Sequence, residues 1–475
     1  MSLRVTTPST CATLIACAMA AVSHAQSGDA PLQASPQAPV PAPFAPLLMP
    51  NGSLASTGVY CHDRGPACAS PGPVLPIGTQ FWQERKLTGD WGGLRTALSD
   101  SGVSVHATST TDLATVVSGG QRQGFLMPYL VDLNAALDTQ RLGLWEGGRA
   151  FIDFQQAGCT QLASKYVPDW WGWDSLNPYT QNYTELAQYW YQQSFADGAL
   201  KLKFGKIDSN ADFGVSYTGS NFITQAAYEP GTLSMQLPTY PNQAGGGEVL
   251  FEPVKGLQGK FGFFDGSTNY YDVDSGGLGA QTGHTGLASF LWENPGSYFL
   301  IAEAGGSWQS DNLSGNVAAG WWQQTGESYG TGVNGAQGVQ GPWGLYASFS
   351  QDLFKPKGGV PNEGLTAFGQ FGWSPPETNP AQWSLMGGLS WQGILPGRAK
   401  DTAGLLTAWN QFSNEPSITT SAGVGEFVFE AFYNIQVTPW LGIQPDVQFV
   451  NQPSSVPSAS VPDAVILTVR VAIAF

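Results

Sequence analysis

The last eleven residues, VILTVRVAIAF, alternate between two kinds of side chain. Every second residue from Val465 to Phe475 is apolar, and the positions between them include Thr468 and Arg470. A period of two residues is that of a β-strand whose two faces meet different surroundings. In a soluble protein the apolar face meets a core, whereas in a membrane barrel it meets lipid. The chain therefore ends in a predicted strand, and the rest of the sequence must indicate which surroundings it meets.

The same alternation recurs from about residue 103 onward, in segments separated by Gly, Asn, Asp and Pro. Examples are MPYLVDLNAALD, ALKLKFG, GEFVFEAFYNIQV and GIQPDVQF. Such segments predict an all-β fold. Strands of about 9–11 residues can cross a bilayer at a tilt. Roughly 375 residues at about 22 per strand and turn predict a transmembrane antiparallel β-barrel of about 16 strands, with 18 as the alternative. FWQERKLTGDWGGLRTALSDSG predicts a short helical segment before it.

Composition favours the barrel over a soluble sandwich. Charged residues make up 11% of the chain, against about 25% in typical soluble domains. On the polar face of the predicted strands, charged and amide side chains are widely spaced, as on a pore wall. Tryptophans cluster near predicted strand ends, where membrane interfaces place aromatic girdles. They are Trp82, Trp91, Trp145, Trp292, Trp308, Trp343, Trp373, Trp383 and Trp440.

The N-terminal region reads as a targeting segment followed by a linker. Arg4 precedes an apolar run that ends in Ser23-His24-Ala25, a pattern typical of a cleaved Sec signal peptide. Cys61 and Cys68 then lie close together and could form a local disulfide or remain two thiols. The predicted organisation is a signal peptide (1–25), a Pro/Ala-rich disordered or extended lead-in (26–79) and the barrel (80–475).

Patterns that indicate catalysis or metal binding are scarce. The chain has no GxSxG, HExxH or P-loop motif. With 4 His and no Cys/His cluster, we expect no metal site and no cofactor. Glu426 and Glu430 lie about 13 Å apart along one strand face, too far for a glycosidase pair unless their side chains converge. A net charge of −16 argues against nucleic acid as a partner. We therefore expect no enzyme.

An aromatic segment at 166–193 provides the first candidate site. Its crowded Trp and Tyr residues do not alternate with polar ones as in a lipid-facing strand, so we expect a long loop with a short helix that folds into the barrel and narrows it. Aromatic faces beside hydrogen-bonding groups suit the C–H faces and hydroxyls of sugars. Alternatively, the rings pack the loop into the barrel or lie at the membrane interface. The candidates are Trp170, Trp171, Trp173 and Tyr183 as faces, with Asp169, Asp174, Asn177 and Gln181 as polar partners.

Charged residues on the polar parity form the second candidate set. Facing charges of both signs would hold a transverse field that orients polar solutes, or would only keep the pore hydrated. The residues expected to face the lumen are Lys201, Lys203, Glu303, Glu426, Glu430, Asp446 and Arg470.

Three stretches resemble the carbohydrate-selective outer-membrane porins of the OprB type. They are LTGDWGGLR (87–95), FGKIDSNADFG (204–214) and EAFYNIQVTPWLGIQPDVQF (430–449), and the chain stops on Phe475 as that family does. The resemblance implies a 16-stranded barrel in a Gram-negative outer membrane that passes monosaccharides such as glucose by diffusion. It also implies that barrel-assembly machinery reads Phe475. The signature residues are Leu87, Thr88, Gly89, Asp90, Trp91, Gly92, Gly93 and Arg95.

Three functions follow from these observations. The first is a passive channel that prefers small neutral sugars and contacts outer-membrane lipid. The second is a non-selective or weakly cation-preferring porin, motivated by the acidic composition. The third is a secreted all-β protein that binds or hydrolyses carbohydrate. The sequence leaves the sugar and the oligomeric state open, a homo-oligomer included.

Overall fold

The computed structural model describes most of the chain from Glu84 onward. The predicted signal peptide, the lead-in with Cys61 and Cys68, Trp82, Asn177 and Gln181 lie outside the described residues. Those described are 84–176, 182–234, 236–266, 286–294, 296–330, 337–360, 362–419, 421, 423–453 and 461–475.

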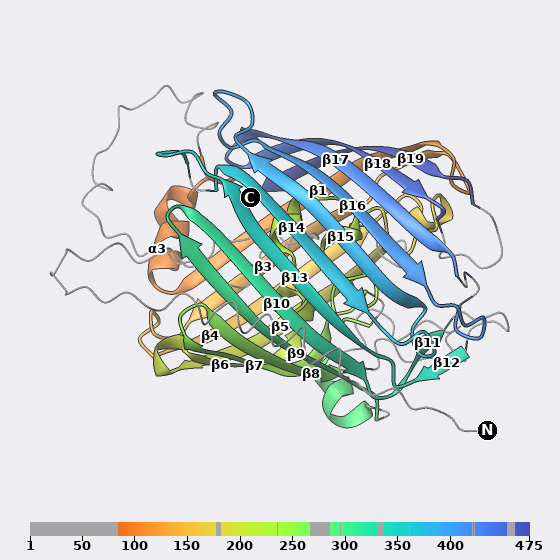
Figure 1. The fold of residues 1–475 in the computed structure, drawn as a ribbon. Helices are drawn as coiled ribbons and strands as arrows, with labels where there is room; N and C mark the ends of the chain where they lie inside the picture. The colour runs from red at the N-terminus through yellow and green to blue at the C-terminus, as the bar shows by residue number, and fades with distance from the viewer. Residues whose placement is uncertain are drawn as a thin grey trace, which may run out of the picture. The chain divides into compact units, whose positions relative to one another are not determined.

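Sixteen long strands form an antiparallel barrel, which closes where β1 pairs with β19 (Figure 1). The short strand β2 (Gly124–Leu126) pairs with the end of β1 and is additional to these sixteen. The prediction of a barrel of about 16 strands is thus confirmed. The barrel strands are β1 (Val103–Ser118), β3 (Tyr129–Asp138), β4 (Gly148–Gly158), β5 (Asn182–Phe195), β6 (Leu200–Ile207), β7 (Ala244–Val254), β8 (Leu257–Asp265), β9 (Tyr298–Ser310), β10 (Leu313–Gln324), β13 (Trp343–Phe354), β14 (Gly364–Trp373), β15 (Ala381–Gln392), β16 (Thr402–Phe412), β17 (Gly425–Thr438), β18 (Leu441–Asn451) and β19 (Ala464–Ala474).

The two faces of each strand differ in the way that the alternation predicts. On β19, Leu467 and Val469 are 47% and 38% exposed, whereas Thr468 is 2% exposed. On β3, Leu133 is 49% exposed and Asp132 is fully buried. An outer surface of large apolar side chains around a polar interior is the pattern of a barrel that meets lipid.

The connections between strands differ at the two ends of the barrel. At one end they are short, as between β7 and β8 or between β17 and β18. At the other end, long connections join β4 to β5, β6 to β7 and β8 to β9. In outer-membrane barrels the short turns face the periplasm. β1 begins and β19 ends at this short-turn end, because Leu441, the first residue of β18, pairs with Ile473.

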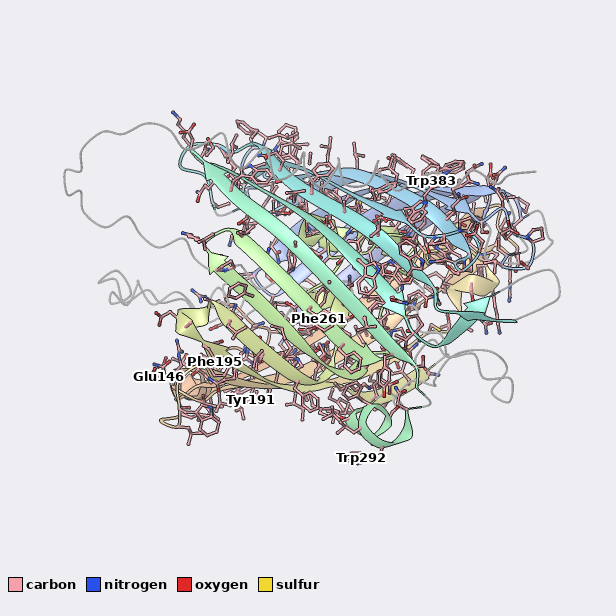
Figure 2. The ribbon with its side chains drawn as sticks, turned by 60° about the horizontal axis from the view of Figure 1, so that its bottom comes forward. Glu146, Tyr191, Phe195, Phe261, Trp292 and Trp383 are labelled. Atoms are coloured by element: carbon pink, nitrogen blue, oxygen red, sulfur yellow. The ribbon has the colours of Figure 1, made fainter. Side chains whose placement is uncertain are left out.

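Aromatic side chains gather on the outer surface near both ends. Figure 2 shows Tyr191 and Phe195 near Glu146 at one end of the barrel and Trp292 near the other. Trp145 Nε1 donates a 2.7 Å hydrogen bond to the Tyr191 hydroxyl, so this part of the belt is itself cross-linked. These positions fit membrane interfaces. Trp440 departs from the expectation, because it is only 7% exposed and so does not lie on the outer surface.

The helical elements are short. The predicted N-terminal helical segment is present as η2 (Trp91–Gly93) and α3 (Leu94–Asp100). Within the described residues, no helix is long and apolar enough to span a membrane. The remaining small elements are η3 (Ala163–Lys165), η4 (Ala196–Gly198), η5 (Ser209–Ala211), η6 (Tyr217–Asn221), η7 (Gln225–Ala227), η9 (Ser289–Glu293) and the hairpin of β11 (Glu327–Gly330) with β12 (Gln337–Gln340).

Candidate functional site

Two connections fold into the barrel and occupy its interior. The first is the β4–β5 connection, here called the aromatic segment and described over 159–176. The second is the β6–β7 connection, residues 208–243, here called the crossing segment. Most described residues of the crossing segment are buried, and it contacts strands on opposite walls of the barrel. Together the two segments form the candidate constriction.

Side-chain caps shape the crossing segment locally. The Asp208 carboxylate accepts the Asn210 N–H and starts η5, and the Thr224 hydroxyl accepts the Ala226 N–H and starts η7. Asp and Thr favour such positions because their side chains satisfy the free N–H groups of a first turn. Short capped turns let a long connection stay compact without strand partners.

The two segments bind each other through their backbones. Ser175 N–H donates to the Ile223 carbonyl at 3.0 Å, and Gln225 N–H donates to the Gly172 carbonyl at 2.9 Å. The Trp170 indole N–H donates to the carbonyl of Gly231 at 2.8 Å. The constriction is therefore one interlocked unit, and a change in one segment is transmitted to the other.

Two glutamates of β17 hold this unit against one wall. The Glu426 carboxylate accepts the Trp170 N–H at 2.9 and 3.0 Å. The Glu430 carboxylate accepts the N–H groups of Ile223 at 2.6 Å and Thr224 at 2.8 Å. Both glutamates are fully buried. They were expected on a hydrated lumen wall, but the structure uses them to anchor the constriction.

An ion pair and a backbone hydrogen bond hold the crossing segment against the opposite wall. Lys203 Nζ contacts the carboxylate of Asp212 and lies 2.7 Å from that of Glu248. Lys260 Nζ lies 2.7 Å from the Glu303 carboxylate, which also accepts the Gly214 N–H at 3.0 Å. The hydroxyl of Tyr346 donates to the same carboxylate at 2.9 Å. All these groups are buried.

Arg470 connects the barrel seam to the aromatic segment. Its guanidinium donates two hydrogen bonds to the Asp112 carboxylate, at 2.8 and 2.6 Å, across the β1–β19 pairing. A third goes to the Ser175 hydroxyl at 3.1 Å. Arg470 was expected to face the channel, and the structure buries it in this bidentate pair.

The remaining charged candidates do not form a common site. Lys201 lies half-buried near the start of β6. Asp446 lies opposite Thr468 in the β18–β19 pairing and is 7% exposed. The structure thus brings Glu426 and Glu430 together with the inward segments, and places Lys203 and Glu303 on the far wall.

The predicted aromatic faces mostly pack the constriction together. Trp171 and Trp173 are 2% and 0% exposed and belong to an apolar cluster that also contains Phe222 and Phe432. Trp170 is half-buried and meets the edge of Phe412 at a centroid distance of 5.2 Å. The sequence suggested either faces for a sugar or rings that pack the loop into the barrel. Trp171 and Trp173 pack the loop.

The two aspartates of the aromatic segment bind backbone. Asp169 accepts the Gly172 N–H at 3.1 Å, and Asp174 accepts the Leu176 N–H at 2.9 Å. Burial raises the pKa of Asp169 to about 7, since the charged carboxylate loses its hydration. These side chains shape the loop from within.

The prediction of one long loop over 166–193 is wrong in its second half. Residues from Asn182 form β5, and Tyr183 lies on this strand, half-buried near Tyr240. A bulge explains the error: Asp153 pairs with Gln188 and Phe154 with Leu186, so Ala187 is an extra residue. The bulge reverses the alternation in the middle of the strand and hides its period.

Sequence reasoning missed the crossing segment as part of the site. It noted only the start, FGKIDSNADFG, and the ion-pair partners Glu248 and Lys260 were not singled out. The sequence feature that could have indicated it is the stretch 208–243. These 36 residues lie between two Gly-flanked strands and show no alternation of apolar and polar residues. Loops that long inside a compact domain are usually functional.

Comparison with known proteins identifies the family. The model of a protein family described as "Carbohydrate-selective porin, OprB family" matches residues 95–475. The chain belongs to this family. As an OprB-family porin it is a barrel of the Gram-negative outer membrane, and the family membership expected from the three sequence stretches is confirmed. Residues 87–94 of the predicted signature precede the matched part.

Individual relatives are distant in sequence. The porin is 20% identical to Porin B of Pseudomonas aeruginosa over 78% of this chain and 87% of that protein. A high-pH structure of Pseudomonas putida OprB superposes with a TM-score of 0.68 at 20% identity, covering 83% of this chain and 99% of that one. A low-pH structure of the same protein gives a TM-score of 0.50 at 18% identity, with the same coverage. These structures support the fold.

Proposed function

We propose that this porin is a passive channel that prefers small neutral sugars such as glucose. The observation that carries the proposal is the set of uncharged polar groups on the inner wall. Both amide atoms of Asn410 and the hydroxyls of Ser384 and Thr468 are buried, with no hydrogen-bond partner among the described residues. Amides and hydroxyls both donate and accept, as sugar hydroxyls do. Buried groups of this kind require water or a solute as partners.

Charge pairing at the constriction supports a neutral solute. Lys203, Lys260 and Arg470 are each bound to carboxylates, so their fields are largely cancelled within the wall. A channel whose charges are engaged in holding its own loops exerts little selection on ions. Such a wall suits a neutral sugar, since a sugar needs hydrogen bonds and no counter-charge.

A weak preference for cations is the second candidate. Buried carboxylates outnumber buried cations on the inner wall; besides the paired ones they include Asp132, Asp153, Glu430 and Asp446. An acidic wall attracts cations. Reversal potentials in a salt gradient across a planar bilayer distinguish the two functions, because a neutral-solute channel gives a value near zero.

Liposome swelling tests the sugar preference directly. We expect glucose to enter faster than an amino acid of equal size, and equal rates would remove the preference. Asn410→Leu should slow glucose entry, as should Ser384→Val, because each removes a polar group that could bind a sugar hydroxyl. The two residues lie opposite each other in the β15–β16 pairing. Thr407→Leu is the matched control, because Thr407 lies on the same strand as Asn410 and is exposed on the outer face.

Three further proposals concern export, assembly and oligomeric state. We infer that residues 1–25 direct export through the Sec pathway. We also infer that the barrel-assembly machinery reads the C-terminal strand with Phe475, and that the porin assembles as a homo-oligomer in the membrane. Deleting Phe475 should lower the amount of folded barrel in outer-membrane fractions.

A further inference from the structure

We propose that Leu87–Arg95 is an intramolecular binding site for the end of β19 and acts as a latch on the barrel seam. The seam is the pairing of β1 with β19, in which Asp112 lies opposite Arg470. All other neighbouring barrel strands follow one another in the chain and are joined by a connection. The strands of the seam, β1 and β19, are not joined by a loop. A third segment that contacts the end of the seam therefore stabilises the closed barrel at a place where no loop does.

The latch binds the backbone oxygens of Ala474 and Phe475. Leu87 N–H donates to the Ala474 carbonyl at 2.8 Å. Arg95 Nη1 donates to the Phe475 oxygen at 2.9 Å. Phe475 N–H in turn donates to the Ala107 carbonyl of β1 at 2.9 Å, so the same residue also joins β1. The end of β19 is thereby bonded to β1 on one side, and the latch bonds to the oxygens of its last residues.

The guanidinium of Arg95 is positioned before it meets β19. Its Nη2 donates to the Thr88 hydroxyl at 3.0 Å, and its central carbon lies 4.2 Å from the centroid of the Trp91 ring. Asp90 accepts the Thr96 N–H at 3.0 Å and fixes the start of α3, on which Arg95 lies. Holding a long side chain in place reduces the rotamer entropy lost on binding.

The backbone of the latch requires its glycines. Gly89 and Gly93 have φ of 62° and 97°, in the region that side chains with a Cβ rarely adopt. The turns at these positions return the chain so that Leu87 and Arg95 reach neighbouring carbonyls of β19. The motif LTGDWGGLR thus serves the latch, because Thr88, Asp90 and Trp91 position Arg95 and the glycines permit the turns.

Lys86 lies beside the latch and is affected by Arg95. Burial, and next the positive charge of Arg95, lower the pKa of Lys86. The two cationic side chains therefore lie close enough to repel each other.

Amide hydrogen exchange of the refolded porin in detergent tests the latch. We expect Arg95→Ala to speed exchange about fivefold along the seam, at Thr108–Val116 and Val465–Ala474, without changing the β7–β8 hairpin. Arg95→Lys, which keeps one donor, should show a smaller increase. Arg85→Ala is the matched control, because Arg85 is exposed in the same segment.

A cross-linked seam separates a latch from a merely local role. Leu113 and Val469 lie opposite each other across the seam and are both exposed on the outer face. Leu113→Cys with Val469→Cys therefore allows a disulfide. With the disulfide formed, Arg95→Ala should no longer speed seam exchange, and after reduction its effect should return. An equal effect of Arg95→Ala in the oxidised and reduced proteins, or no effect in either, would overturn the proposal.

Discussion

The two walls of the barrel hold the same constriction by different chemistry. On the wall of β6 to β9, the crossing segment is held by the ion pair of Lys203 with Asp212 and by the Gly214 N–H bond to Glu303. On the wall of β17, Glu426 and Glu430 accept backbone N–H groups of the inward segments. The first wall recognises a particular side chain of the loop in addition to its backbone. The second recognises only the course of its backbone.

This difference separates what each wall demands of the loop sequence. A backbone N–H is present whatever the residue, unless it is proline, so positions such as Ile223 can change while the bond to Glu430 persists. Asp212 cannot change in the same way, because a buried Lys203 would lose a counter-charge. The β17 wall therefore tolerates variation in the loop, and the β6–β9 wall constrains it.

Removing Lys203 should give the largest effect. Lys203→Met leaves the carboxylates of Asp212 and Glu248 buried without their shared cation. Breaking a buried ion pair on one side costs about 3–5 kcal/mol. Thermal unfolding in detergent should show a clear loss of stability. The double variant Lys203→Met, Glu248→Gln should recover part of it, and no recovery would contradict the ion-pair account.

Removing Glu430 tests the other wall. Glu430→Ala leaves the N–H groups of Ile223 and Thr224 without their acceptor, at about 1–3 kcal/mol for each buried donor. Because the backbone anchor is lost, single-channel recordings should show a larger and noisier conductance. Glu430→Gln keeps one acceptor oxygen and should lie between wild type and Glu430→Ala. If both variants conduct as wild type does, the carboxylate does not position the loop.

Truncating Trp170 should have a smaller effect. Trp170→Ala removes the indole bond to Gly231 and the ring contact with Phe412, but its backbone N–H still reaches Glu426. We expect a loss of about 1–2 kcal/mol, below that for a fully buried tryptophan. Conductance should rise without the noise expected for Glu430→Ala. Noise equal to that of Glu430→Ala would show that the ring, and not the backbone, carries the anchor.

The smallest effect is a change in pH dependence. Burial raises the pKa of Asp169 from an ordinary value near 4 to about 7 in the folded protein. The unfolded chain releases this proton first, so this group lowers stability as pH rises from about 4 to 7, with no further change above. Asp169→Asn should flatten that part of the stability profile. An unchanged slope between pH 4 and 7 would assign it to other groups.

The sequence predicted the exposed and buried faces correctly for strands in which apolar and polar residues alternate without interruption. On β3 and β19 the parity of apolar residues is also the parity of exposed ones, as Leu133 and Leu467 illustrate. On β5 it failed, because the extra residue Ala187 shifts the alternation and only the pairing with β4 shows the bulge. A period can be read along one segment, whereas a bulge is defined by the neighbouring strand.

The candidate site was predictable only in part, for a related reason. The aromatic segment was expected to fold inward, and Trp170 does lie at the constriction. The anchoring role of Glu430 could not be expected, because its partners are 207 and 206 residues away in the chain. Contacts at such separation depend on barrel closure and on the path of loops with no periodic pattern.

The sequence by itself determined most of the strands, their lipid-facing and inward faces, and the family. It could do so because backbone geometry turns a period of two into two faces, whatever the partner strand is. Only the tertiary structure decided what those inward groups do. Arg470 meets Asp112 across 358 residues, and Arg95 meets Phe475 across 380. Both pairs form only when the first and last strands come together, and that closure is a property of the whole barrel.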